Sequence, residues 1–129
     1  MRDNFHAADI RAASRSILFA GGTGAASMLG IAKRLASAGQ RFELHNFAQS
    51  ADRAVLQEEI DALRHHGKVH HYFDLSHDQF AQTSAHAMSP AHACTQIYCS
   101  GPQAFMDLIE RQAREWVYAV NVHRISAAA

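Results

Sequence analysis

One junction constrains the fold more than any other feature of this sequence. A short uncharged run, Ser16–Ala20, leads directly into the loop Gly21-Gly22-Thr23-Gly24. Such a run is typical of a strand that is covered on both faces. After the loop, apolar residues recur at the spacing of one helix face, and Gly39 supplies a helix stop. These apolar residues are Met28, Ile31, Ala32 and Leu35. A strand, a glycine loop and a helix in this order predict the first unit of an α/β fold.

The alternation of strand and helix patterns continues along the chain. One helix is expected between Ser50, with Asp52 in its first turn, and Gly67, and another begins at Gly101-Pro102 with the proline as its first residue. The polar stretch 74–94 has no assigned element. The further strands expected are Arg41–Phe47, Lys68–Phe73, Thr95–Cys99 and Ala119–Arg124. This order predicts an α/β three-layer sandwich with a five-stranded, mainly parallel sheet.

The composition is that of one globular domain without a nucleic-acid surface. A length of 129 residues fits a single domain, 1–129. Lys plus Arg and Asp plus Glu both number 12, so the chain has no basic surplus for phosphate backbones. The uncharged stretch 16–32 is interrupted by glycines and is shorter than the roughly 20 apolar residues of a membrane span. We therefore expect a cytoplasmic protein that binds neither nucleic acid nor a membrane.

The number and spacing of the cysteines and histidines bear on disulfides, iron–sulfur clusters and metal sites. Cys94 and Cys99 are too few for a disulfide scaffold or for an iron–sulfur cluster, which takes four ligands. His65-His66 lies at the expected end of a helix, where histidine interacts favourably with the helix dipole. His70-His71 lies on an expected strand, so its two side chains point to opposite faces. We expect no metal site.

Two loops are expected to meet at the carboxyl edge of the sheet, where parallel sheets of this kind bind ligands. They are Gly21–Ser27 and Cys99–Gln103. Glycines let a backbone approach a pyrophosphate, and the following helix N-terminus presents free N–H groups. The dinucleotide fingerprint is incomplete, because Ser27 stands at the third glycine and no acidic residue follows the second strand. The first loop is therefore either a phosphate cradle or a tight structural turn.

Several motifs follow one another in an order that is specific to one family. They are Arg2-Asp3-Asn4-Phe5, Gly21-Gly22-Thr23-Gly24, Phe42-Glu43-Leu44-His45, Gly101-Pro102-Gln103-Ala104-Phe105-Met106-Asp107 and Val122-His123-Arg124. The order resembles the pyridine-nucleotide-binding domain of the ferredoxin reductase superfamily, in particular the phthalate dioxygenase and vanillate demethylase reductases, over about residues 2–124. The resemblance implies an oxidoreductase that takes hydride from NADH onto a flavin and passes electrons to an iron–sulfur centre.

The same resemblance implies which residues bind the cofactor. The positions are Gly21, Gly22, Thr23, Gly24, Ser50, Ser100, Gly101 and Pro102. The first four would hold the pyrophosphate, and Ser50 would lie near the adenosine ribose. The last three would lie near the nicotinamide, with Ser100 as the candidate catalytic residue.

Three departures from the family pattern bear on activity. Ser100 replaces a cysteine beside the hydride-transfer centre, and Cys99 should not substitute for it, because adjacent strand residues point to opposite faces. Gln49 replaces an arginine, which removes a cation suited to a 2′-phosphate. Ala25-Ala26-Ser27 replaces the usual Ile-Thr-Pro after the glycine loop.

Two hypotheses follow from this pattern. The first is an NADH-binding module of an electron-transfer reductase, with the flavin, FMN or FAD, on an absent domain or a partner chain. Its partners would be the nicotinamide nucleotide and a flavin-domain or iron–sulfur protein. Neither the flavin barrel nor the iron–sulfur domain is expected within these residues. The alternative is a degenerate, non-catalytic domain of the same fold that serves as an interaction or regulatory module.

Overall fold

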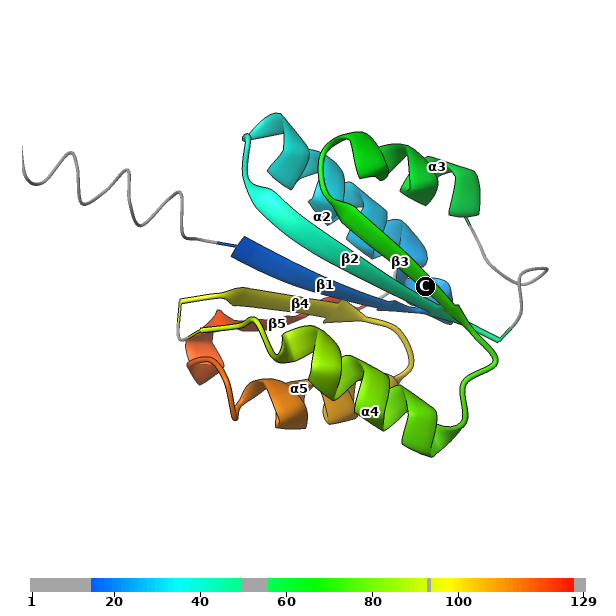
Figure 1. The fold of residues 1–129 in the computed structure, drawn as a ribbon, viewed down its shortest axis with the longest axis vertical. Coiled ribbons are helices and arrows are strands. Elements are labelled where there is room, and N and C mark those ends of the chain that lie inside the picture. The colour runs from blue at the N-terminus through cyan, green and yellow to red at the C-terminus, as the bar shows by residue number, and fades with distance from the viewer. Residues whose placement is uncertain (1–14, 50–55, 93, 127–129) are drawn as a thin grey trace, which may run out of the picture.

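A computed structural model describes residues 15–49, 56–92 and 94–126, which form a three-layer α/β sandwich (Figure 1). The sheet has the strand order β3-β2-β1-β4-β5, and all neighbouring strands are parallel. The strands are β1 (Arg15–Gly21), β2 (Arg41–Ala48), β3 (Lys68–Phe73), β4 (Gln96–Ser100) and β5 (Val122–Arg124). The helices are α2 (Ala25–Ser37), α3 (Gln57–Ala62), α4 (His77–Met88) and α5 (Gln103–Ala113). The predicted fold class is confirmed.

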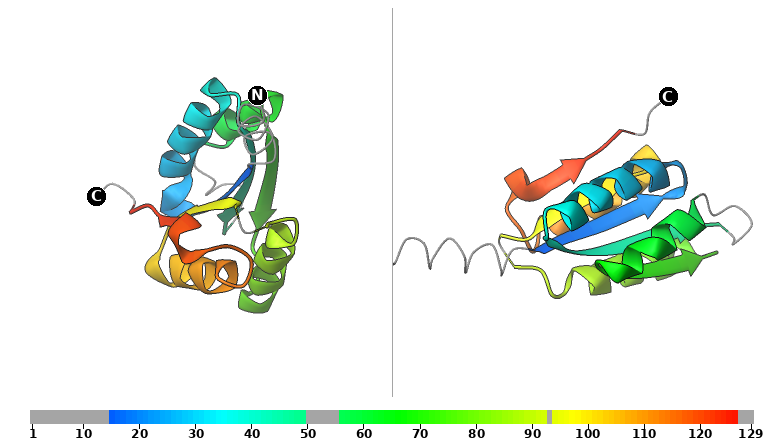
Figure 2. Two further views of the ribbon diagram at one scale, coloured as in Figure 1. Left: turned by 90° about the vertical axis from the view of Figure 1, so that its left-hand side faces the viewer. Right: turned by 90° about the horizontal axis from the view of Figure 1, so that it is seen from above.

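The central position of β1 in the sheet explains why its run Ser16–Ala20 is uncharged. Helices α2 and α3 cover one face of the sheet, and α4 and α5 cover the other (Figures 1 and 2). Leu18 and Ala20 belong to the apolar cluster on the α2 side, whereas Ile17 and Phe19 belong to the cluster on the α4 side. All four side chains are fully buried. Each of the three large ones contributes about 1.5–3 kcal/mol by leaving water, so β1 ties the two helical layers together.

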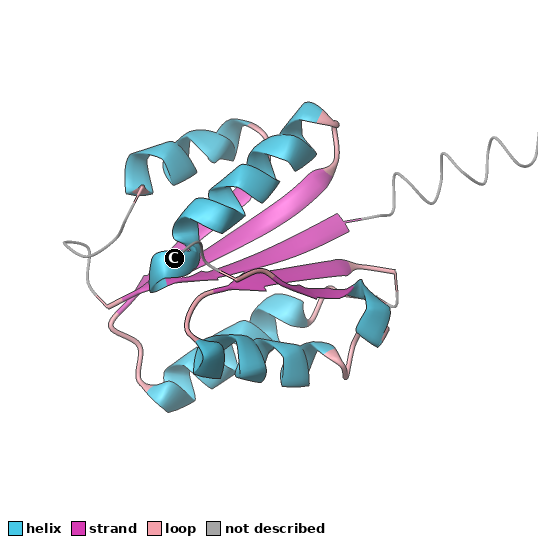
Figure 3. Ribbon diagram, turned by 180° about the vertical axis from the view of Figure 1, so that it is seen from behind, coloured by secondary structure: helices cyan, strands magenta, loops and turns pink. Residues whose placement is uncertain are grey.

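The strand order also fixes where a ligand crevice can form. From β1 the chain moves outward to β2 and β3, and then returns across the sheet to β4 on the other side of β1. Seen from behind, the strands run between the two helical layers, and their connections lie at the sheet ends (Figure 3). The carboxyl ends of β1 and β4 therefore lie at the topological switch point, where open α/β sheets bind ligands.

Helix α4 lies in the stretch 74–94, for which the sequence pattern predicted no element. The helix begins with a capping box. The Ser76 hydroxyl accepts the Gln79 N–H at 3.1 Å, and the Gln79 side chain accepts the Ser76 N–H at 2.9 Å. Its buried face includes Ser84, which is bonded to Gln112 of α5 at 2.7 Å. Because Ser84 is polar, the buried face of α4 lacks a regular apolar spacing in the sequence. The capping-box pattern Ser76-x-x-Gln79 does mark the start of the helix.

Several element boundaries differ from the predicted ones. Pro102 is the N-cap of α5 rather than its first residue, with an extended ψ of 152°. The last strand is shorter than predicted, because Ala119–Asn121 forms a 3-10 turn before it. Helix α3 starts after Leu56, while the predicted cap Ser50 and its neighbour Asp52 lie outside the described residues.

Within the described part of the chain, no helix has the length and apolar character needed to cross a membrane.

Candidate functional site

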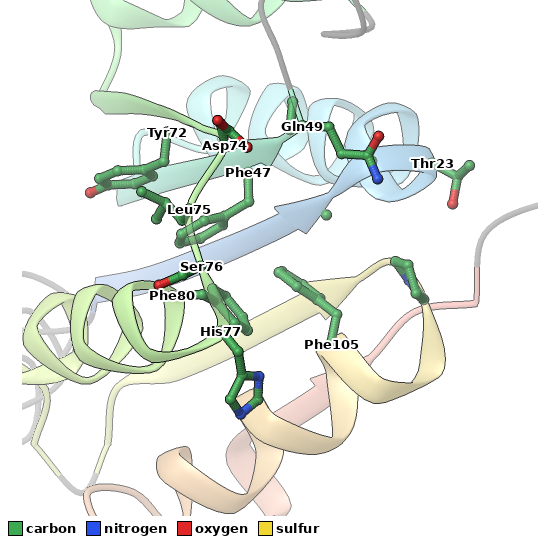
Figure 4. Close-up of a pocket in the computed structure, with 14 residues that line it drawn as sticks. Thr23, Phe47, Gln49, Tyr72, Asp74, Leu75, Ser76, His77, Phe80 and Phe105 are labelled. Atoms are coloured by element: carbon green, nitrogen blue, oxygen red, sulfur yellow. The ribbon is translucent and has the colours of Figure 1, made fainter.

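A cavity of about 770 Å³ opens at the carboxyl edge of the sheet (Figure 4). Residues that follow four neighbouring strands contribute to its wall, together with the first turns of α4 and α5. The described lining residues are Gly21, Gly22, Thr23, Phe47, Ala48, Gln49, Tyr72, Asp74, Leu75, Ser76, His77, Phe80, Pro102 and Phe105. The cavity thus lies where the sequence predicted a ligand site.

The first loop forms one end of this cavity and leads into α2 through the 3-10 turn Gly22–Gly24. Gly22 has a φ of +51°, a left-handed conformation that glycine adopts readily. Gly24 lies so close to β4 that a Cβ atom there would overlap the carbonyl oxygen of Ser100. No side chain caps α2 at Gly24, and its first turn contains no acidic residue. The Ala25 N–H is bonded to the Gly22 carbonyl oxygen within the 3-10 turn Gly22–Gly24, so this end of α2 offers an anion the positive end of the helix dipole, with no competing side chain.

The second loop packs directly against the first, as predicted. A Cβ atom on Gly101 would lie 2.8 Å from the carbonyl oxygen of Gly21 and 3.1 Å from the Phe105 ring. A Cβ on Gly21 would likewise lie 2.9 Å from the Phe105 ring. Both glycines are required because two backbones and an aromatic ring share this space. The loops form one rigid floor rather than two separate connections.

Not every predicted site residue reaches the cavity. Gly21, Gly22, Thr23 and Pro102 line it, whereas Gly24, Ser100 and Gly101 do not. Ser100 is fully buried, and its hydroxyl has no hydrogen-bond partner among the described residues. Ser50 lies outside the described residues. The structure therefore places Ser100 beneath the loop floor, without direct access to the cavity.

Cys99 lies on the opposite face from Ser100, as predicted. It packs into the apolar cluster on the α4 side and is fully buried. Burial raises the pKa of its thiol to about 11. A thiol in this environment stays protonated and is a poor nucleophile, so Cys99 does not replace the missing cysteine of the family motif.

Four aromatic rings line one side of the cavity, and the sequence analysis did not predict this cluster. Phe47 stacks on Tyr72 with the ring centroids 4.7 Å apart, and Phe80 stacks on Phe105 at 5.1 Å. Phe47 meets Phe80 edge to face at 4.9 Å, which joins the two pairs. The rings come from β2, β3, α4 and α5, so no local spacing reveals them. The resulting surface is apolar and suits a planar ring.

Two polar side chains of β2, His45 and Glu43, support the Tyr72 ring. Its hydroxyl is hydrogen-bonded to Nδ1 of His45 at 2.9 Å, and Nε2 of His45 lies 3.5 Å from a Glu43 carboxylate oxygen. The close approach of His45 lowers the pKa of Glu43, and the charges of Arg15 and Lys68 add to that effect. These groups border a second cavity of about 450 Å³ between the sheet and α4.

The histidine pairs do not form a metal site. His71 is hydrogen-bonded to Asp61 of α3 at 2.7 Å, while His70 stacks on His45 at 4.9 Å on the opposite face. Among the described residues, no group of three or more His, Cys, Asp or Glu side chains is placed to hold a metal ion.

Known proteins resemble this chain in sequence as well as in fold. No protein-family model matches it. A vanillate O-demethylase oxidoreductase from Pseudomonas sp. (strain HR199 / DSM 7063) is 37% identical over 111 residues, which are 85% of this chain and 35% of the relative. A phthalate dioxygenase reductase from Burkholderia cepacia is 33% identical over 104 residues, 78% of this chain and 31% of the relative. The chain is a homologue of these oxygenase reductases. The family resemblance predicted from its motifs is confirmed.

A solved structure shows how much of such a reductase is shared with this chain. Phthalate dioxygenase reductase, described as a modular structure for electron transfer from pyridine nucleotides to a 2Fe–2S centre, is 30% identical to this chain. The match has a TM-score of 0.67 and covers 90% of this chain and 36% of that protein. The chain thus spans about a third of the length of the reductases it matches.

Proposed function

We propose that this chain is the NADH-binding module of a flavin-dependent reductase and presents the nucleotide to a flavin carried elsewhere. The observation that supports this most is that Gly22 and Thr23 line the cavity directly before α2, whose positive dipole end has no side-chain cap. The backbone of a glycine loop and the positive end of a helix dipole favour the binding of phosphate. The pyrophosphate would therefore rest on Gly21–Gly24.

The end of the cavity at Pro102 and Phe105 would receive the nicotinamide half of the nucleotide. Pro102 and Phe105 border the cavity next to the glycine loop, and the apolar rings exclude water from that side. When bound, a flavin supplies the hydride acceptor. The residues of this chain bind the nucleotide, orient its ring and keep water away, which is how positioning contributes to hydride transfer. Ser100 would affect the bound nucleotide only indirectly, through the backbone of the two loops, because its side chain does not line the cavity.

The relatives favour this function over the non-catalytic alternative. They are named as reductase components of oxygenase systems, and the matched solved structure is described as receiving electrons from pyridine nucleotides. An iron–sulfur or oxygenase component is accordingly the proposed final acceptor. Gln49 lines the cavity where an arginine would suit a 2′-phosphate, so NADH rather than NADPH is the proposed donor.

Thr23→Glu tests the pyrophosphate position. Thr23 is exposed, so the new carboxylate does not disturb the core. At about 4 Å, two like charges repel by roughly 1 kcal/mol in water and about 4 kcal/mol near a protein surface. NADH binding, measured by titration calorimetry, should therefore weaken at least about fivefold.

Ser37→Glu is the matched control, because it places the same charge at the exposed far end of α2. It should leave NADH affinity unchanged, and both variants should keep the wild-type unfolding temperature within a few degrees. If wild-type protein fails to bind millimolar NADH, or if Thr23→Glu binds as well as wild type, the proposed function is wrong.

A further inference from the structure

The acidic residue that dinucleotide-binding folds place after the second strand is missing here, since β2 is followed by Gln49. Its usual role is to accept hydrogen bonds from ribose hydroxyls. Asp74 follows the neighbouring strand β3 and lines the same cavity. A carboxylate therefore remains available at this edge, displaced by one strand.

The chain holds Asp74 against the end of β2. Its backbone N–H donates to the carbonyl oxygen of Ala48 at 3.1 Å, which extends the β2–β3 ladder by one further bond. Its φ of +55° is a left-handed conformation, which Asp tolerates better than most residues. This bond and backbone turn fix the position of Asp74 beside Ala48 and Gln49.

The order of the strands sets the direction of a bound nucleotide. Pro102 follows β4, Gly22 follows β1, Gln49 follows β2 and Asp74 follows β3, and these strands are adjacent in the sheet. Three strand spacings of about 4.8 Å separate the first from the last, roughly 14 Å in all. In Figure 4, Thr23, Gln49 and Asp74 lie along one side of the cavity, opposite Phe80 and Phe105. With the nicotinamide at Pro102, the adenosine half extends toward Asp74.

The charge of the wall agrees with a neutral polyhydroxyl group at that end. Among the described lining residues, Asp74 carries the only carboxylate, and none is Lys or Arg. Ribose hydroxyls can donate to this carboxylate. A 2′-phosphate would instead place further negative charge beside it, with no described lysine or arginine in the wall.

We infer that Asp74 binds the 2′,3′-diol of the adenosine ribose and makes the site selective for NADH over NADPH. This inference rests on the proposed function and adds a specificity-determining residue to it. In other dinucleotide sites an acidic residue after β2 has this role. Here Asp74, which follows β3, has it instead.

Asp74→Asn is the direct test, with NADH and NADPH titrated separately by calorimetry. Hydrogen bonds to a charged group are worth enough that NADH affinity should fall about tenfold. NADPH affinity should stay constant or rise, because the repulsion is removed. Asp78→Asn is the control: Asp78 is an exposed carboxylate in the first turn of α4, four residues away, and it does not line the cavity. It should change neither affinity.

The outcomes separate this inference from the function on which it rests. If wild type binds NADH and Asp74→Asn weakens both nucleotides equally or neither, the inference is overturned and the proposed function stands. If wild type binds neither nucleotide at millimolar concentration, both are overturned. A fall in the NADH-to-NADPH affinity ratio in Asp74→Asn alone supports the assignment to Asp74.

Discussion

The two ends of the cavity are built from different parts of the polypeptide. We call the loops Gly21–Gly24 and Ser100–Pro102 the glycine floor, and Phe47, Tyr72, Phe80 and Phe105 the aromatic wall. In the glycine floor, backbone touches backbone, and a single added Cβ at Gly24 would overlap the Ser100 carbonyl. In the aromatic wall, four side chains from four elements meet at centroid distances of 4.7–5.9 Å.

This difference implies different tolerance to change. In the glycine floor the closest contacts are between backbone atoms, so an atom added at Gly24 must move a strand or a helix. The aromatic wall can repack its rings, and its position depends on polar support behind Tyr72. The glycine floor should therefore respond to added volume, and the aromatic wall should respond to the charge state of Glu43.

The largest effect is expected from Gly24→Ala. The methyl group would overlap the Ser100 carbonyl, so α2 must move away from β4. Overpacking of this kind should lower the free energy of unfolding by about 3 kcal/mol. NADH binding should be lost as well, because the cavity-lining residues Gly22 and Thr23 shift together with α2. Denaturant titration and calorimetry measure both quantities.

Gly30→Ala is the control for that substitution. Gly30 lies within the same helix, is exposed, and has nothing within 4 Å of its Cβ position. Alanine should therefore stabilise α2 by about 0.5–1 kcal/mol through its better helix propensity. Equal effects of the two substitutions would contradict the close contact between the two loops.

A smaller effect is expected from Ser100→Cys in the glycine floor. The Ser100 hydroxyl is buried without a partner among the described residues, and a thiol loses less on leaving water. The free energy of unfolding should rise by about 1 kcal/mol. NADH affinity should stay the same, because Ser100 does not line the cavity. When a flavin domain from a homologous reductase is supplied, NADH oxidation should become faster, since the family motif has cysteine here.

Ser84→Cys provides the contrast, because Ser84 is equally buried but donates to Gln112 at 2.7 Å. Its unfolding free energy should fall by about 1 kcal/mol as this bond is lost. A loss of stability in both variants would show that the Ser100 hydroxyl is satisfied in solution. An unchanged rate of NADH oxidation in Ser100→Cys would support the non-catalytic alternative.

The glycine floor and the aromatic wall also differ in how far the sequence predicted them. The glycine floor was predicted because its requirements are local: an uncharged strand, closely spaced glycines and Gly101-Pro102 are visible in the chain itself. The aromatic wall was not predicted, because Phe47 and Tyr72 share an edge with Phe80 only after α4 folds back under the sheet. Helix α4 itself was missed because Ser84 and two histidines, His77 and His86, obscure its apolar period. Asp74 needed the β2–β3 register before its place beside Gln49 could be seen.

The smallest expected effect concerns the pH dependence of the aromatic wall. Folding lowers the pKa of Glu43 below its ordinary value of 4.5, chiefly through the close approach of His45. Stability from this group is therefore present above about pH 4.5 and is lost as pH falls through the lower folded value. Because Glu43 is partly solvated, the contribution should be about 1 kcal/mol or less. In wild type, Tyr72 should then lose its support through His45, whereas the glycine floor contains no titratable side chain.

Glu43→Gln should remove this component, so its unfolding free energy should fall less than that of wild type between pH 6 and about pH 3. Glu115→Gln, at an exposed position away from the cavity, should keep the wild-type slope. Near-ultraviolet circular dichroism reports the aromatic packing in the same samples. Parallel pH profiles for all three proteins would mean that the Glu43–His45–Tyr72 chain does not hold the wall, and that ring packing alone positions it.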